Sequence, residues 1–395
     1  MNHKIIYLVF TSILLLWGCE TNDFSSEQTK HFIKFFGSYS LDYGKDVIAD
    51  DDGYILVGSR ATPNKGREVL VIKTDEYGNT VWEKTYGGNL DDEGNCIRSV
   101  AGNGYIILGS KTDSTNKTDV LLLKIASDGT LEWEKSIDNT NNETGKMLKV
   151  LDNRYLILGN SDASNPGTNN PQGSQDIILI STDLSGNVIW KSTFGGNGND
   201  VGNDLLVLKN SFLIIGSSNS FQGNGQQNTN IIVLKTSTSG GLIDMAIHGG
   251  AENDFGLGVC AHKDGIVICG TTNSFAESGT DMYVARLEDD LRTASWTMVY
   301  GQQGNDDGMD VLFHNNEIIA AGNNEITGGT AGMLVKINEE GTFLSESSFG
   351  GIGVQSFNAV KSAPDGGFIL VGSSNFEQNS MIVLTKTSNN GKLTQ

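Results

Sequence analysis

The sequence predicts an all-β fold, a seven-bladed β-propeller with four antiparallel strands in each blade. One unit of about fifty residues recurs seven times along the chain. Each copy contains four short strand-like segments separated by turns, and four antiparallel strands at this period are typical of a propeller blade. The seventh copy lacks its fourth strand, and the N-terminal region carries an extra one. We therefore expect the N-terminal strand to complete the last blade and close the ring.

A glycine that ends the most apolar strand marks every copy of the unit. Successive glycines lie 50 to 57 residues apart, which is regular enough to indicate one structural unit per interval. These glycines are Gly58, Gly109, Gly159, Gly216, Gly270, Gly322 and Gly372.

The first copy shows the four expected strands, at about 45–49, 54–59, 69–74 and 81–86. An Asp-Gly pair between the first two apolar runs is typical of a tight hairpin. The second and third strands are continuously apolar, so both of their faces must be covered. Stacking of neighbouring blades would provide that cover.

The N-terminal segment 31–36 repeats the aromatic spacing of the fourth strands. Phe32 and Phe36 are four residues apart, as are Trp82 and Tyr86, and a glycine follows the second aromatic residue in both segments. Pairing of this segment with the last strand would remove an exposed sheet edge. We expect a single propeller domain over residues 31–395, with a monomeric body.

The first thirty residues are typical of a processing signal. Lys4 precedes an apolar stretch at 5–17 that is short for a membrane span. Segment 16–19, Leu-Trp-Gly-Cys, resembles a bacterial lipobox. That resemblance implies a signal peptide at 1–18 and a lipid on Cys19, with 19–30 as a linker spanning roughly 18 Å. The alternatives are a cleaved signal with a free Cys19, or an uncleaved anchor.

This N-terminal signal predicts that the protein lies at a bacterial membrane, the outer membrane, and faces the periplasm or the cell surface. The formal net charge of −20 excludes nucleic acid as a partner, because phosphate binding needs a basic surface.

The repeated body resembles the quinoprotein-like and WD-repeat-like β-propellers of bacterial envelope proteins, over residues 31–395. Segment 182–190 is similar to the quinoprotein tryptophan-docking turn but is one residue shorter between Asp183 and Gly186. We therefore expect no quinone cofactor, and the resemblance bears on the fold more than on activity.

An acidic residue recurs six positions after the aromatic residue that ends the fourth strand. One interpretation is that each carboxylate accepts backbone N–H groups in its own turn. The other is an acidic ring at the mouth of the central channel that holds a cation or a hydroxyl-rich ligand, with Ca²⁺ as the natural ion. The six acids are Asp42, Asp92, Glu143, Asp200, Asp254 and Asp306, and the seventh copy has Gln355.

Long polar loops follow the second strand of each copy and share one face of the disc with the acid-bearing loops. Phe221, Phe275 and Phe376 occupy similar positions in three of these loops. Exposed phenylalanines would anchor a protein or stack on a sugar. Alternatively, they fold back over their own loops.

Three cysteines follow Cys19. If the pair at 264–265 forms a two-residue turn, Cys260 and Cys269 face each other across a hairpin, close enough to bridge. The alternative is that Cys96, Cys260 and Cys269 are buried thiols.

No motif of a catalytic nucleophile, a Walker A loop or paired metal-binding histidines occurs in the sequence. We therefore predict a membrane-anchored, non-catalytic binding or scaffold protein that recognises a protein or glycan through its loop face. The alternative is an envelope carbohydrate-active enzyme that uses carboxylates near the channel.

Overall fold

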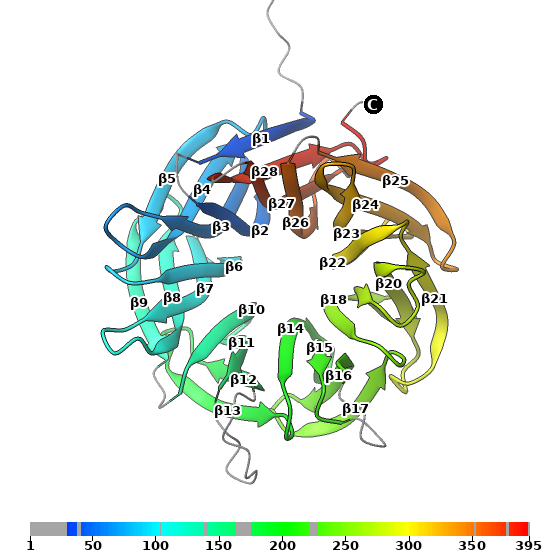
Figure 1. Ribbon diagram of the computed structural model, residues 1–395. Helices are drawn as coiled ribbons and strands as arrows, with labels where there is room; N and C mark the ends of the chain where they lie inside the picture. Colours follow the sequence, from blue (N-terminus) through cyan, green and yellow to red (C-terminus); the bar gives the residue numbers. More distant parts are fainter. Residues whose placement is uncertain are drawn as a thin grey trace, which may run out of the picture.

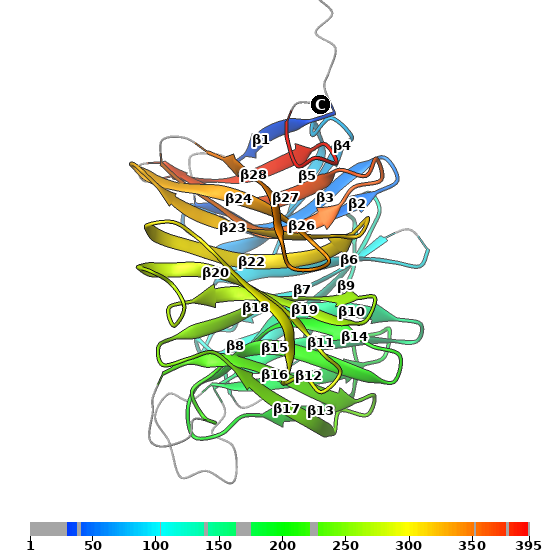
Figure 2. The same cartoon turned by 90° about the vertical axis from the view of Figure 1, so that its right-hand side faces the viewer.

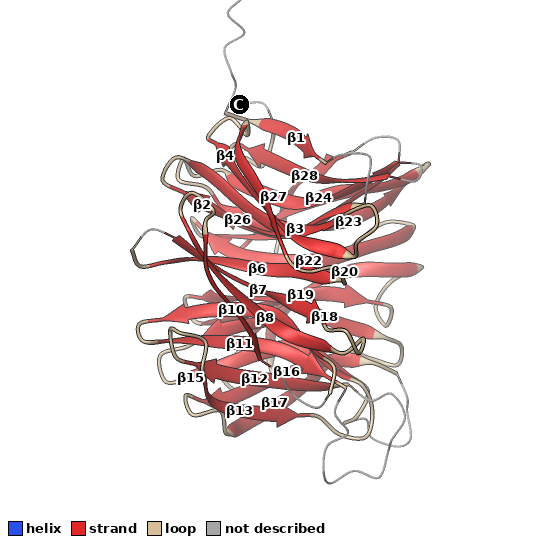
Figure 3. Cartoon of the chain, turned by 90° about the vertical axis from the view of Figure 1, so that its left-hand side faces the viewer, coloured by secondary structure: helices blue, strands red, loops and turns tan. Residues whose placement is uncertain are grey.

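The computed structural model describes residues 30–37, 41–102, 104–137, 141–162, 175–221, 228–350, 353–376 and 379–393. The predicted signal peptide, Cys19 and nearly all of the linker lie outside these ranges. Every regular element in them is a β-strand (Figure 3). The described part of the chain has no helix that could cross a membrane.

Four separate antiparallel sheets of four strands each form the first part of the chain. The first contains β2 (Asp42–Asp50), β3 (Gly53–Ala61), β4 (Arg67–Asp75) and β5 (Thr80–Tyr86). The second contains β6 (Asp92–Val100), β7 (Gly104–Thr112), β8 (Thr118–Ala126) and β9 (Leu131–Ile137). The third contains β10 (Glu143–Leu151), β11 (Arg154–Ser161), β12 (Asp176–Thr182) and β13 (Val188–Phe194). The fourth contains β14 (Asp200–Val207), β15 (Ser211–Ser218), β16 (Asn230–Ser237) and β17 (Leu242–His248).

The remaining strands form one twelve-stranded sheet made of three antiparallel groups. Two short parallel pairings link the groups, at Gly279–Gly304 and at Gly329–Gly353. The first group contains β18 (Asp254–His262), β19 (Gly265–Thr272), β20 (Gly279–Leu287) and β21 (Ala294–Tyr300). The second contains β22 (Gly304–His314), β23 (Glu317–Ile326), β24 (Gly329–Asn338) and β25 (Phe343–Phe349). The third contains β26 (Gly353–Ser362), β27 (Phe368–Phe376), β28 (Asn379–Thr387) and β1 (Phe32–Phe36).

The sheets are arranged around a common centre, with the first strand of each unit innermost (Figure 1). Seen from the side, the strands run from one face of the disc to the other (Figure 2). One face carries the hairpins within each unit that join strands one to two and three to four. The other carries the long loops and the connections between units, and we call it the loop face.

The predicted pairing of the N-terminal strand is confirmed. β1 runs antiparallel to β28, with Phe32 opposite Lys386 and Phe36 opposite Ile382. Both phenylalanines are buried, and they share a hydrophobic cluster with Tyr54 and Leu384. The N-terminal strand is thus held to the C-terminal strand by backbone hydrogen bonds and by apolar contacts.

The second and third strands of each unit are buried on both faces, as predicted from their continuous apolar runs. All seven residues of β12 are buried. Hydrophobic clusters lie between neighbouring sheets rather than within one sheet: Val57 and Val71 of the first sheet pack with Ile107 and Leu121 of the second. Packing between sheets therefore holds the body together.

The expected hairpin register around Asp264 is wrong. His262 pairs with Gly265, so Lys263 and Asp264 form the turn and Cys260 lies opposite Val267. A β-bulge between Gly256 and Gly258 changes the register only of the residues that precede it, and so leaves the pairing of Cys260 unaffected. All three cysteines of the described residues are free thiols, as the alternative interpretation expected: Cys96, Cys260 and Cys269.

Candidate functional site

The six recurring acids each begin the innermost strand of a unit or lie close to that point, on the loop-face side. Their exposed fractions are 0% to 3%, so none of them presents its carboxylate to solvent. The acids lie in separate units, and the structure does not gather them at one place. They are Asp42, Asp92, Glu143, Asp200, Asp254 and Asp306.

Four of these carboxylates bind the backbone of their own loop. The amide four residues earlier donates to the carboxylate in each case: Gly88 to Asp92 at 2.6 Å, Gly196 to Asp200 at 2.8 Å, Gly250 to Asp254 at 2.8 Å and Gln302 to Asp306 at 2.6 Å. The turn-capping interpretation is confirmed for these four residues. Whether any of the acids also binds a ligand stays a prediction.

The other two recurring acids pair with cations. Arg60 contacts Asp42, with its Nε donating to both carboxylate oxygens at 3.0 and 3.1 Å. Lys191 forms an ion pair with Glu143. At these two places the protein itself supplies a positive charge to a buried carboxylate.

A second set of acids was missed by the sequence reasoning. Each member directly precedes the apolar run of a third strand, and two of them face the recurring acid of the next unit. Asp176 lies beside Asp200 in this way, and Asp281 lies beside Asp306. An acid immediately before an apolar strand was the available signal. The acids at this position are Glu68, Asp119, Asp176 and Asp281, and the fourth unit has Asn230.

The pKa values of Asp176 and Asp281 are raised in these pairs. Burial and the neighbouring carboxylate of Asp200 raise the pKa of Asp176 to about 6. Burial and the carboxylate of Asp306 likewise raise the pKa of Asp281. In both cases burial and a like charge nearby disfavour the ionised form of the residue that precedes the third strand.

The loop face exposes two of the three predicted phenylalanines. Phe221 is 37% exposed and Phe275 is 49% exposed. The ring of Phe275 stacks on Tyr283 with centroids 6.1 Å apart, so this side chain covers its own unit and also meets solvent. The side chain of Phe376 lies outside the described part of the chain.

Phe221 lines a groove of about 540 Å³ between two neighbouring units. Phe194 of β13 lies on one side, and Ile232, Leu234 and Met245 of β16 and β17 lie on the other. The groove is mostly apolar, and an exposed aromatic ring is part of its wall. It could accept an apolar side chain or the flat face of a sugar.

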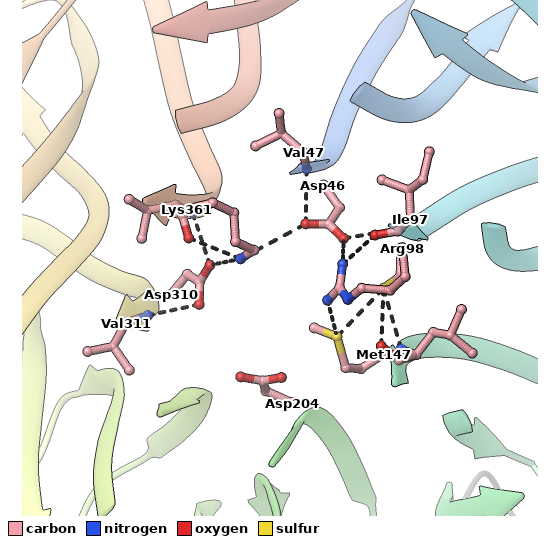
Figure 4. A network of polar contacts seen from close by, with 12 residues as sticks. Asp46, Val47, Ile97, Arg98, Met147, Asp204, Asp310, Val311 and Lys361 are labelled. Carbon is pink, nitrogen blue, oxygen red and sulfur yellow. Dashed lines mark hydrogen bonds and ion pairs between the residues drawn. The ribbon is translucent and has the colours of Figure 1, made fainter. Parts of the chain in front are cut away.

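The central channel contains a charged network that the sequence reasoning also missed (Figure 4). Asp46 accepts from the Ile97 amide at 3.1 Å, Asp204 from Val259 at 3.0 Å and Asp310 from Val360 at 2.9 Å. Each aspartate thereby joins its own innermost strand to the innermost strand of the next unit. The three aspartates lie four residues after Asp42, Asp200 and Asp306, and this repeated spacing was the feature of the sequence that could have revealed them.

Cations complete this network. Arg98 forms an ion pair with Asp46, and Lys361 Nζ lies 2.7 Å from Asp310 Oδ2 and 4.0 Å from Asp46 Oδ1. Burial alone would raise the pKa of Asp46, but Arg98 and Lys361 outweigh burial and hold that pKa below its ordinary value. A cavity of about 170 Å³ in the channel is lined by Lys45, Lys146 and other residues, with none of the six recurring acids among them.

The described residues contain no cluster of three or more His, Cys, Asp or Glu side chains arranged to hold a metal ion. Two features of the described residues are candidates for binding: the exposed aromatic surface of the loop face and the buried carboxyl pairs between units.

No protein-family model and no curated protein matches the sequence. Among solved structures, the chain is similar to the WD40 β-propeller domain of Doa1, with a TM-score of 0.55, 13% identity and coverage of 91% of this chain and 97% of that one. It is also similar to the β-propeller domain of the Trilobed protease from Pyrococcus furiosus, with a TM-score of 0.49, 10% identity and coverage of 90% and 98%. At these identities the likeness concerns the fold alone. The sheet arrangement and the likeness to the Doa1 domain identify the fold as a β-propeller.

Proposed function

We propose that this chain is a membrane-anchored, non-catalytic β-propeller that binds a protein or glycan through its loop face. The observation that carries the proposal is the pair of exposed phenylalanines, Phe221 and Phe275, at equivalent positions in neighbouring units. Large apolar side chains exposed on one face of a rigid scaffold favour a binding surface. The groove beside Phe221 extends from that surface along β13 to the hairpin between β16 and β17, and it adds a concave element.

The proposal includes a closed ring of seven blades, the last completed by β1. Pairing of β1 with β28 supports it. So does a contact between the last unit and the first, where the Asn358 side-chain amide donates to the Gly44 carbonyl at 2.7 Å. A closed ring leaves no unpaired sheet edge and gives the loops a rigid support.

The proposal also includes a lipid on Cys19 at a bacterial outer membrane. Lys30 Nζ lies 2.7 Å from Glu76 Oε2, and Glu76 belongs to the turn between β4 and β5. The described chain therefore begins at the face opposite the loop face, where the hairpins within each unit lie. A short linker from a lipidated cysteine would hold that face toward the membrane and direct the loop face away from it, where a partner can reach it.

The anchor is tested by Cys19→Ser in the native host. We expect this variant to leave the membrane fraction and the wild type to stay in it. A variant that remains membrane-bound and keeps its signal sequence would instead indicate an uncleaved anchor.

The binding surface is tested with glycan arrays and with photocrosslinking in cells. Phe221→Ala/Phe275→Ala should weaken saccharide binding at least tenfold, and Phe35→Ala, which removes a similarly exposed ring of β1, should leave binding unchanged. If no saccharide binds, p-benzoylphenylalanine at position 275 should crosslink a protein partner, and the same residue at exposed Val81 of β5 should not. Equal binding by both alanine variants, or crosslinking only from position 81, would contradict a loop-face site.

The alternative, a carbohydrate-active enzyme, rests on the carboxylates. A glycosidase needs two carboxyl groups that reach the scissile bond, whereas the six recurring acids are buried. Release of reducing sugar from envelope glycans, lost in Asp200→Asn, would favour the enzyme over the binding protein.

A further inference from the structure

The junction between the third and fourth units holds two carboxylates aimed at one point. A Cβ added at Gly195 would overlap Asp176 Oδ1 and lie 2.9 Å from Asp200 Oδ2. The junction between the fifth and sixth units repeats this geometry, since a Cβ at Gly301 would overlap Asp281 Oδ1 and lie 2.9 Å from Asp306 Oδ2. The same arrangement thus occurs twice in the chain.

These carboxylates are buried, and some of their oxygens have no partner. Asp176 is 0% exposed and neither of its oxygens accepts a hydrogen bond. Asp281 is 6% exposed, and its Oδ1 accepts no hydrogen bond. A buried carboxylate oxygen without a donor is strongly unfavourable unless another group satisfies it.

The protein supplies no cation to either pair. No Lys, Arg or His of the described residues forms an ion pair with any of the four carboxylates, Asp176, Asp200, Asp281 and Asp306. By contrast, Arg60 forms an ion pair with Asp42, and Lys191 forms one with Glu143. The hydroxyl of Ser220, which donates to Asp200 Oδ2 at 2.5 Å, is neutral. Each pair is therefore a concentration of negative charge that a bound cation would neutralise.

We propose that each of these two carboxyl pairs binds one divalent cation of the Ca²⁺ class, which ties adjacent units together. Ca²⁺ prefers carboxylate oxygens and tolerates irregular coordination, with water or backbone carbonyls filling the remaining positions. The free oxygens of Asp176 and Asp281 are its first ligands. This inference does not depend on the proposed partner of the loop face.

The fourth unit provides an internal comparison. A Cβ at Gly249 would overlap both Asn230 Oδ1 and Asp254 Oδ2, so Asn230 occupies the position of Asp176 and Asp281. The neutral carboxamide at this junction removes one negative charge compared with the other two junctions. The fold therefore accepts Asn at this position, and Asp176→Asn and Asp281→Asn should fold.

The experiment is a CaCl₂ titration of the full chain after treatment with EDTA, followed by thermal unfolding and equilibrium dialysis. We expect two ions bound per chain and a rise of several degrees in Tm for the wild type. Asp176→Asn/Asp281→Asn should bind no ion at these junctions and lose the rise. Glu340→Gln, which removes an exposed charge outside the pairs, should behave as the wild type does.

Two results would overturn the proposal. The first is a wild type that binds no Ca²⁺ in dialysis and whose Tm does not change with CaCl₂, while the double Asn variant is more stable than the wild type in EDTA. In that case each carboxyl pair shares a proton and needs no cation. The other is an unchanged response in the double Asn variant, since the ion then binds elsewhere. Each single variant should bind one ion, which keeps the test valid if the double variant fails to fold.

Discussion

The side-chain amide of Asn358 donates to the backbone carbonyl of Gly44 at 2.7 Å and joins strands that are 314 residues apart in the chain. Asn95 and Asn203 make the equivalent bond to the glycine carbonyl of the following unit, at 2.9 and 2.8 Å. The junction between the last and first units is therefore built as the internal junctions are.

This relationship predicts the effect of removing the amide. Asn358→Ala should lower the free energy of unfolding by about 1 kcal/mol, the usual contribution of one hydrogen bond. Asn203→Ala is the matched control at an internal junction and should lose a similar amount. Urea unfolding measures both losses. If Asn203→Ala lowers the free energy of unfolding and Asn358→Ala does not change it, the last and first units are not in contact.

The two faces of β1 predict opposite responses to truncation. Phe36 is 8% exposed and packs in the cluster shared with β28, whereas Phe35 is 47% exposed. Phe36→Ala should lower the free energy of unfolding by about 3 to 5 kcal/mol, through lost burial and the cavity left behind. Phe35→Ala should change it by less than about 1 kcal/mol. Similar losses in both variants would mean that β1 is not packed in the body.

Close approach between units requires glycine on the innermost strands. A Cβ at Gly94 would lie 2.6 Å from Val57 Cγ2 and 3.0 Å from the Gly58 carbonyl, whereas one at Gly88 would meet only Asp92 Oδ2 at 3.8 Å. We expect Gly94→Ala to lower the free energy of unfolding by about 1 to 3 kcal/mol through overpacking. Gly88→Ala should leave the free energy of unfolding nearly unchanged. Thermal unfolding of the two variants side by side distinguishes these outcomes.

The ion pair of Asp46 with Arg98 predicts a dependence of stability on pH. Because the pKa of Asp46 is lower in the folded protein than its ordinary 3.8, its stabilisation is present above about pH 4 and is lost as the pH falls through the folded pKa. Asp46→Asn leaves Arg98 without its buried partner and should cost about 3 kcal/mol at pH 7. The difference between variant and wild type should shrink below pH 4, and a difference that is constant from pH 7 to pH 3 would contradict the assignment.

The three described cysteines should remain thiols and react slowly. Burial raises the pKa of Cys96 to about 12 and also raises those of Cys260 and Cys269, which disfavours the reactive thiolate. Iodoacetamide at pH 8 should modify the native protein little. After unfolding without reductant, mass spectrometry should show all three alkylated, and a Cys260–Cys269 disulfide would appear as two unmodified residues.

The repeat predicted the strands and the N-terminal pairing because both depend on local patterns. Apolar runs, Asp-Gly turns and aromatic spacing are read within a few residues, and the match between 31–36 and segments such as 82–87 needed no distance information. The turn-capping role of Asp92 and Asp200 was likewise local, since the donating amides lie four residues earlier.

The features that were missed arise where one unit meets the next. Asp176 and Asp200 are 24 residues apart, and only the stacking of two sheets brings them together. Asp46 and Arg98 meet between the innermost strands of adjacent units for the same reason. The error at Cys260 had a local cause, because a turn displaced by one residue moved its partner from Cys269 to Val267.

The pairing of β1 with β28 sets an order of events in the cell. β1 is the first of these strands to leave the ribosome and β28 is the last, so the first strand waits without its partner through nearly the whole of synthesis. The contact between them has the longest loop to close and can form only after the intervening sheets exist. Until then both edges are open to pairing with another chain. A protein built in this way depends on being kept from its neighbours until its last strand is made.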